Sequence, residues 1–185
     1  MSSFVVSLVR RCIYENRKFL FYCHDPKNGD GCIDPYITAY TVWNDIPPSF
    51  RRVLAPNPRF YIMIIRMKRK QARVLCCSDD KQNLIAYGWI QNWKPFRRRF
   101  GKITKEGSML GPYWTAPGSR RQGLYSRLLS HSIALCSKEW PIMIYTSPEN
   151  IASQKGIQKA GFETMGKWEK KRWFGIISRF RRISP

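Results

Sequence analysis

The sequence predicts a mixed α/β or α+β domain built on one sheet, and two observations point to this class. Short apolar stretches rich in Val, Ile, Phe and Tyr dominate residues 1–115, and such stretches are typical of strands. After residue 120 the apolar side chains recur at helical spacing, and a strand, a second helix and two more strands follow. This order is that of a sheet with flanking helices. At 185 residues we expect one domain over the whole chain, 1–185.

The first half of the chain contains most of the predicted strands. They cover residues 4–9, 18–23, 59–67, 73–77, 84–93 and 108–115. Residues 35–45 are ambiguous, and a helix is one interpretation of them. Four prolines interrupt residues 47–58, so we expect an irregular connection there with at most one helical turn.

The second half alternates helices and strands. The predicted elements are an amphipathic helix over 122–139, a strand over 142–146, a second helix that ends at Gly161, and strands over 163–168 and 173–178. The basic tail over 167–185 has two interpretations. As a helix it would be an amphipathic anchor at a membrane surface, and as a strand it would complete the last hairpin of the sheet, which we favour.

The charge balance points to an anionic partner. The chain has 33 Lys and Arg against 12 Asp and Glu, which gives a formal net charge of +21. Nucleotides, polysaccharides, nucleic acids and membrane surfaces fit this charge, and binders of cationic ligands are excluded. The basic residues gather in three stretches: 51–73, 94–105 and 167–182. Near the middle stretch, four aromatic side chains are candidates for stacking on bases or sugars: Trp89, Trp93, Phe96 and Phe100.

The six cysteines indicate a reducing, cytoplasmic environment with free thiols. No Cys-x-x-Cys pair occurs, and the run from Cys23 and His24 to Cys32 does not repeat the ligand spacing of a zinc site, so we predict no metal. We also expect no targeting segment, because residues 4–9 are too short for the apolar region of a signal peptide.

The segment from Tyr113 to Leu129 carries the clearest chemistry. A strand ends, a Gly/Pro/Ser turn follows, and a helix begins near Gly123. The first N–H groups of a helix lack intrahelical partners and lie at its positive end, where they bind phosphate. Glycine lets an anion approach, and Arg120 and Arg121 add charge at the same place. We therefore predict an anion site, most simply for a diphosphate.

A second segment, residues 150–162, follows the next predicted strand. Together the two segments resemble the GCN5-related N-acetyltransferase (GNAT) family. The family's first motif, Arg/Gln-x-x-Gly-x-Gly/Ala, is matched from Arg120 to Tyr125, and its second, Asn-x-x-Ala/Ser followed by Gly-Phe, is matched by Asn150, Ser153 and Gly161-Phe162. The similarity covers residues 108–165.

The resemblance implies a mixed, mostly antiparallel sheet that splays open to bind acetyl-coenzyme A. The pyrophosphate would lie on the main chain of Gln122, Gly123, Leu124, Tyr125 and Ser126, beside Arg120 or Arg121. The pantetheine would pair with the main chain at Tyr113 and Thr115, and Asn150 and Ser153 would line its far side. An amine would attack the thioester directly, and a main-chain N–H would polarise the carbonyl.

Two positions depart from the family pattern. The third motif position, Gly or Ala in the family, is Tyr125, whose ring must either point away from the pyrophosphate or stack over it. Many members have a general acid, Tyr, seven residues after the Asn, and Ile157 stands there in this chain. Tyr145 is the nearest substitute for that acid, and Glu106 is a candidate base, although water alone would also serve. His24 and His131 are weaker candidates.

These inferences predict a cytoplasmic N-acetyltransferase acting on an amine of an anionic acceptor. A nucleotide-linked or lipid-linked amino sugar for a surface polysaccharide is the first choice. Aminoacyl-tRNA, as used by GNAT toxins, is the second, and a non-catalytic nucleic-acid-binding module with this fold is the third. A peripheral membrane contact and a monomer or homodimer remain open.

Overall fold

The computed structural model describes residues 14–24, 31–57, 60–136, 141–173 and 177–184. These residues form one eight-stranded sheet in the order β2-β3-β4-β5-β6-β1-β7-β8. The strands are β1 (Tyr14–His24), β2 (Ile37–Tyr40), β3 (Ala72–Ser78), β4 (Leu84–Asn92), β5 (Ser108–Thr115), β6 (Ile142–Thr146), β7 (Phe162–Trp173) and β8 (Ile177–Ser184). The strand predicted at residues 4–9 lies outside the described residues.

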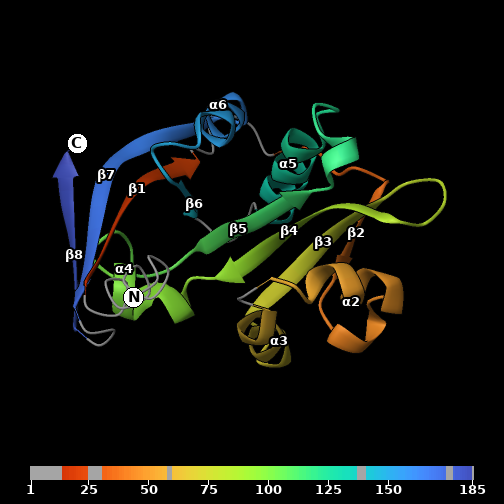
Figure 1. Ribbon diagram of the computed structural model, residues 1–185, viewed down its shortest axis with the longest axis horizontal. Coiled ribbons are helices and arrows are strands. Elements are labelled where there is room, and N and C mark those ends of the chain that lie inside the picture. The colour runs from red at the N-terminus through yellow and green to blue at the C-terminus, as the bar shows by residue number, and fades with distance from the viewer. Residues whose placement is uncertain (1–13, 25–30, 58–59, 137–140, 174–176, 185) are drawn as a thin grey trace, which may run out of the picture.

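Helices lie on both sides of the sheet, so the predicted class is confirmed (Figure 1). They are α2 (Pro48–Leu54), α3 (Phe60–Lys68), α4 (Arg97–Phe100), α5 (Leu124–Cys136) and α6 (Ile151–Lys159), with 3-10 turns η2 (Trp43–Asp45), η3 (Lys94–Phe96) and η4 (Pro117–Ser119). None of the helices within the described ranges is long and apolar enough to cross a membrane.

The core divides along the two faces of the sheet. On one face α5 and α6 bury side chains such as Leu128 and Ile157 against β3 to β7. On the other face α2 and α3 cover β3 and β4, with Met63 and Met67 buried, and α4 covers an aromatic cluster around Phe21. Side chains alternate between the two faces along each strand, so one strand contributes side chains to the core on both faces of the sheet.

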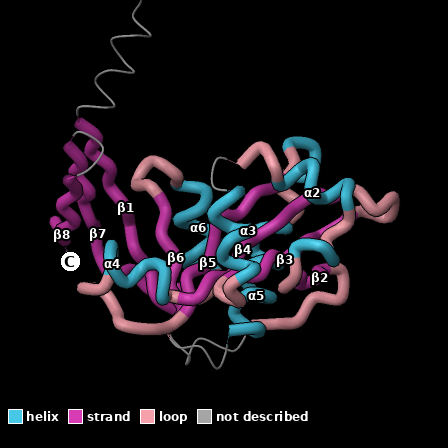
Figure 2. Tube along the Cα trace, turned by 90° about the horizontal axis from the view of Figure 1, so that it is seen from below, coloured by secondary structure: helices cyan, strands magenta, loops and turns pink. Residues whose placement is uncertain are grey.

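Strand β1 occupies a place that no local signal predicts. It pairs antiparallel with β6 on one side, with Leu20 opposite Thr146, and with β7 on the other, with Lys18 opposite Glu169. Figures 1 and 2 both show β1, β7 and β8 together at one end of the molecule and β2 with α2 at the other. The early strand therefore supports β6 from the side opposite to β5.

Three sequence-based expectations need correction. The strand predicted over 59–67 is the helix α3, because two methionines at helical spacing bury one side of it while Ile62 and Ile65 stay exposed. The connection over 47–58 contains α2, a seven-residue helix with a proline in its first turn, where the missing N–H costs nothing. Residues 35–45 form β2 and a 3-10 turn.

Most other predictions for the second half of the chain agree with the structure, but the strand predicted over 173–178 is wrong, because Trp173 ends β7 and Ile177 begins β8. The strands at 108–115 and 142–146 are β5 and β6, and the helix predicted from 122 runs over α5. The basic tail over 167–185 contains the second half of β7 and the strand β8, which pairs antiparallel with β7 and completes the hairpin. The alternative of an amphipathic helical anchor in the tail is therefore wrong.

Candidate functional site

The candidate site is the gap where the strands β5 and β6 separate. These two strands are parallel and pair only at their first residues, Ser108 with Ile142 and Met109 with Met143. All other neighbouring strands in the sheet are antiparallel. Beyond Met109 and Met143 the two strands share no further pairs, so a wedge opens toward their carboxyl ends (Figure 1).

The main chain of β5 points into this wedge. The N–H of Ala116 donates to the carbonyl of Ile85 at 2.8 Å, and bonded and non-bonded pairs alternate along an antiparallel ladder. The polar main-chain groups of Trp114 therefore face β4, whereas those of Tyr113 and Thr115 face the wedge. An extended ligand with amide groups would find donors and acceptors at strand spacing here.

The loop between β5 and α5 closes the wide end of the wedge. Gly123 has φ +74°, in the left-handed region that glycine favours, and a Cβ there would meet no atom within 4 Å. Helix α5 starts at the next residue, with the main-chain N–H of Arg127 bonded to the carbonyl of Gly123. The first N–H groups of α5, which lack intrahelical partners, follow the exposed Gly123 and lie close along the chain to Arg120 and Arg121, which are both exposed.

Solved structures of acetyltransferases share the overall fold. An acetyltransferase of the GNAT family from Colwellia psychrerythraea aligns with a TM-score of 0.59 over 98% of the chain at 18% identity. A GCN5-related N-acetyltransferase from Sphaerobacter thermophilus aligns with a TM-score of 0.57 over 94% of the chain at 11% identity. The chain has the GNAT fold.

An aminoglycoside N-acetyltransferase, AAC(6')-Iy, in complex with coenzyme A also aligns, with a TM-score of 0.52 and 17% identity, over 69% of this chain and 90% of its own. The chain spans 62% of the length of the Colwellia structure and 57% of the Sphaerobacter structure. No protein-family model and no curated protein matches the sequence. At these identities the likeness establishes the GNAT fold alone. Evidence for a reaction has to come from the geometry of the site.

Tyr125, which departs from the GNAT motif, points away from the anion loop. Its ring lies against Gly156 of α6, where a Cβ would come within 2.7 Å of the ring, and it meets Tyr113 edge-on with centroids 5.3 Å apart. Burial raises the pKa of Tyr125 to about 12, although a hydrogen bond with the Ser153 side chain opposes the rise. The phenol therefore joins α5 to α6 and leaves the loop open.

The second motif stabilises the N-terminus of the helix α6. The Oδ1 of Asn150 accepts the main-chain N–H of Ser153 at 3.1 Å, which makes Asn150 the N-cap of α6. Leu124 and Ile157 are buried in the core, so their side chains are closed to a ligand. The predicted coenzyme contacts of Asn150, Ser153, Gln122 and the neighbouring loop residues stay predictions.

The two predicted catalytic residues do not lie together. Tyr145 is on the β6 wall beyond the last pair with β5, on the face opposite α5, and packs against Phe19 and Phe21 with centroids 5.3 and 5.2 Å away. Glu106 is exposed in the loop before β5. Counted along the two parallel strands, they are five positions apart, or roughly 16 Å. Tyr145 borders the wedge, and Glu106 lies behind its closed end.

Both histidines serve packing. His24 is buried, with its ring 5.2 Å from that of Phe162. The Nδ1 of His131 accepts the main-chain N–H of Asp34 at 2.9 Å, and burial lowers its pKa. The carboxylate of Asp34 in turn accepts two hydrogen bonds from the guanidinium of Arg127, at 2.6 and 2.9 Å. This cluster fixes the segment before β2 on α5, so the role of His131 here is structural.

Sequence reasoning missed Gln91, which reaches the closed end of the wedge. Its Nε2 donates to the carbonyl of Gly111, and its Oε1 accepts from Arg66 of α3. Gly111 lies in the bulge where the β4–β5 register shifts, just past the last β5–β6 pair. A lone buried amide in the apolar stretch of β4 was the available signal.

The expectation that aromatic side chains near residues 94–105 stack on bases is wrong for three of the four. Trp89, Trp93 and Phe100 are at most 2% exposed and belong to the core. Phe96 is half-buried, and the guanidinium of Arg66 lies 4.7 Å from its ring centroid. The basic stretch therefore lacks a row of open aromatic rings for nucleic acid.

Proposed function

We propose that the protein transfers the acetyl group of acetyl-coenzyme A to an amine. The observation that carries this proposal is the wedge between β5 and β6, with outward main-chain groups along one wall and an exposed, basic helix N-terminus at its mouth. This is the set of groups that a ligand with a pyrophosphate at one end and amides along its arm requires. The GNAT fold agrees with the proposal.

The coenzyme would lie with its pyrophosphate on the first N–H groups of α5 and its pantetheine along Tyr113 and Thr115. Its thioester would then reach the closed end of the wedge near Gly111. There the nitrogen of the acceptor forms a bond to the acetyl carbon, the carbon–sulfur bond breaks, the amine loses a proton and the thiolate gains one. Main-chain dipoles oriented by β5 would stabilise the oxyanion.

We assign the proton for the departing thiolate to Tyr145, since Ile157 cannot supply one. Tyr145→Phe keeps the ring between Phe19 and Phe21 and removes only the hydroxyl. We expect turnover to fall by about 10²-fold or more, with acetyl-coenzyme A affinity unchanged. Steady-state thiol release and calorimetry measure the two quantities. Full activity of the variant would leave the proton to water.

The acceptor that we favour is an amine on an anionic carrier, such as a nucleotide-linked or lipid-linked amino sugar met in the cytoplasm. The support is the net charge of +21, far beyond what one coenzyme needs. An aminoacyl-tRNA is the competing acceptor. Salt separates the two, because affinity for RNA falls steeply with ionic strength as several phosphates release counterions, whereas affinity for a nucleotide sugar falls little.

The test uses the purified chain, acetyl-coenzyme A and a panel of amines that includes hexosamine nucleotides and charged tRNA. We expect calorimetric binding of acetyl-coenzyme A and thiol release that depends on one acceptor class. Failure to bind acetyl-coenzyme A overturns the proposal as a whole. Binding without transfer to any amine would leave a coenzyme-binding protein of another function and would overturn the enzymatic part.

A further inference from the structure

The helix α3 has an apolar face that no other described element covers. Tyr61, Ile62 and Ile65 are 77%, 48% and 50% exposed, although the opposite side of the helix buries Met63 and Met67. At 100° per residue the three exposed side chains fall within one 100° sector, so they form a single stripe. Scattered exposed apolar residues need no explanation, but a stripe of three on one short helix does.

The rim of this stripe is positively charged. Lys68, Arg69 and Lys70 follow at the end of α3 and are exposed, and Arg52 of α2 is exposed as well. The sequence has no Asp or Glu from residue 46 to 78, and Asp45 in the neighbouring η2 and Asp79 after β3 are the first acids on either side of this stretch. We define the exposed stripe together with Lys68, Arg69 and Lys70 as the α3 face.

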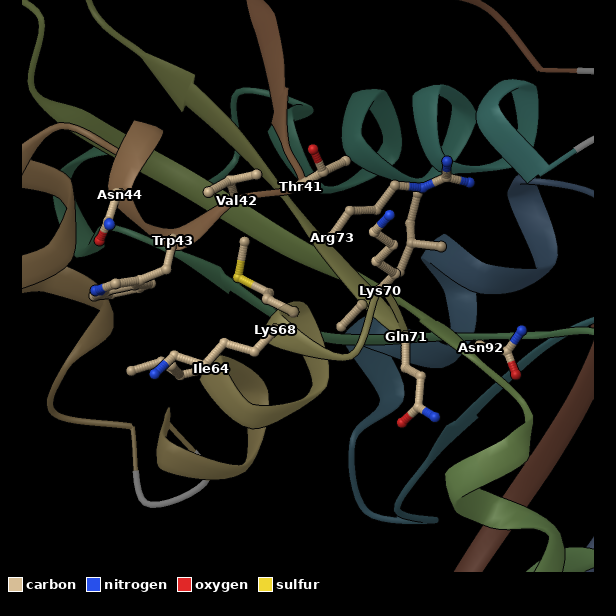
Figure 3. Close-up of a pocket in the computed structure, with 13 residues that line it drawn as sticks. Thr41, Val42, Trp43, Asn44, Ile64, Lys68, Lys70, Gln71, Arg73 and Asn92 are labelled. Atoms are coloured by element: carbon tan, nitrogen blue, oxygen red, sulfur yellow. The ribbon is translucent and has the colours of Figure 1, made fainter.

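A cavity of about 780 Å³ opens beside the α3 face (Figure 3). It lies between α3 and the segment that follows β2, along the part of the β3 edge that β2 leaves uncovered. Val42, Ile64 and Met67 give it apolar walls, and Lys68, Lys70 and Arg73 line it as well. Its size is that of a small-molecule site, and its lining suits an apolar chain with an anionic head.

We propose that the α3 face docks the protein on an anionic lipid surface. A bilayer interface accepts isoleucine and tyrosine side chains at the acyl boundary and supplies phosphates for the surrounding cations. Nucleic acid would use the cations but has no place for the isoleucines. A second copy would bring two basic rims of the same sign together, which costs free energy. The proposal does not depend on acetyl transfer.

The test is co-sedimentation of the full chain with two kinds of vesicle, phosphatidylcholine alone and an equal mixture of phosphatidylcholine and phosphatidylglycerol. We expect binding to the mixed vesicles and little to the neutral ones. Ile65→Ser should weaken binding to mixed vesicles by about tenfold. Lys68→Gln should weaken it by about fivefold, the effect of one cation near an anionic surface.

Matched control variants lie on α6, on the other side of the sheet. Ile151 is 54% exposed and Lys155 is exposed, so Ile151→Ser and Lys155→Gln make the same chemical changes away from the α3 face. Both should bind like the unchanged protein. The proposal is overturned by absent binding to mixed vesicles or by equal losses in the α3 and α6 variants. Two other results also overturn it: a dimer that Ile65→Ser dissociates, or tRNA binding that Ile65→Ser weakens.

Discussion

The two walls of the wedge use their polar groups differently. On the β5 wall the main chain of Tyr113 and Thr115 faces the gap, and the loop after it exposes helix N–H groups and two arginines. On the β6 wall the side chain of Asn150 caps the N-terminus of α6, and the side chain of Ser153 forms a hydrogen bond with Tyr125. The comparison implies that the β5 wall holds the coenzyme, while the β6 wall holds α6 in place.

The strongest test of this comparison is Gly123→Glu on the β5 wall. Glutamate disfavours the left-handed backbone at φ +74° and places a carboxylate where the pyrophosphate would lie. We expect acetyl-coenzyme A affinity to fall by at least about a hundredfold, or about 2.8 kcal/mol, by calorimetry.

Gly118→Glu is the matched control. Gly118 lies in η4 of the same loop, and a side chain there meets no atom within 4 Å, so this variant adds the same charge without the left-handed backbone. We expect a loss of only a few-fold from charge alone. If both variants lose affinity equally, the loop acts through its net charge, and the proposed contact with the helix N-terminus is lost.

Gln91→Leu tests the closed end of the wedge and should have the next largest effect. The buried amide joins the Gly111 carbonyl to Arg66, and its loss leaves the carbonyl of the half-buried Gly111 without that donor. We expect the free energy of unfolding to fall by roughly 1–3 kcal/mol in urea titrations. Gln91→Glu keeps an acceptor for Arg66 and removes only the donor to Gly111, so the difference between the two variants isolates the Arg66 contact, and the loss common to both isolates the Gly111 contact.

Sequence reasoning succeeded where a local signal dictates structure. The turn residues between Tyr113 and Gly123 and the change to helical spacing at Leu124 determine where β5 ends and α5 begins. It failed at α3, whose apolar residues continue around the helix because one side is core and the other is exposed. Such a run has no clear period, and its β-branched residues favour a strand. The position of β1 depends on pairing with residues more than a hundred positions away, which no local pattern encodes.

The contact between the two walls, Tyr125 on Gly156, is a third test. In Gly156→Ala the new methyl group would lie 2.7 Å from the Tyr125 ring, although alanine favours the helix by about 1 kcal/mol. We therefore expect Gly156→Ala to raise the free energy of unfolding of a Tyr125→Ala variant. In the unchanged protein the same substitution should raise it less, or lower it. A double-mutant cycle of unfolding free energies should give a coupling of about 1–2 kcal/mol. Zero coupling would mean that the ring does not rest on α6, and the explanation for an open loop beside Tyr125 would fail.

The smallest effect is expected on the β6 wall, from Asn150→Ala. Loss of the N-cap of α6 should lower the free energy of unfolding by about 1 kcal/mol, and Asn150→Asp, which can still accept the Ser153 N–H, should restore it. Because the capped side chain is already committed, acetyl-coenzyme A affinity should change less than about threefold, or 0.7 kcal/mol, in either variant. A larger loss of affinity in Asn150→Ala, at a temperature where the variant stays folded, would mean that the amide also contacts the coenzyme. The two walls would then share the ligand, and the asymmetry between them would disappear.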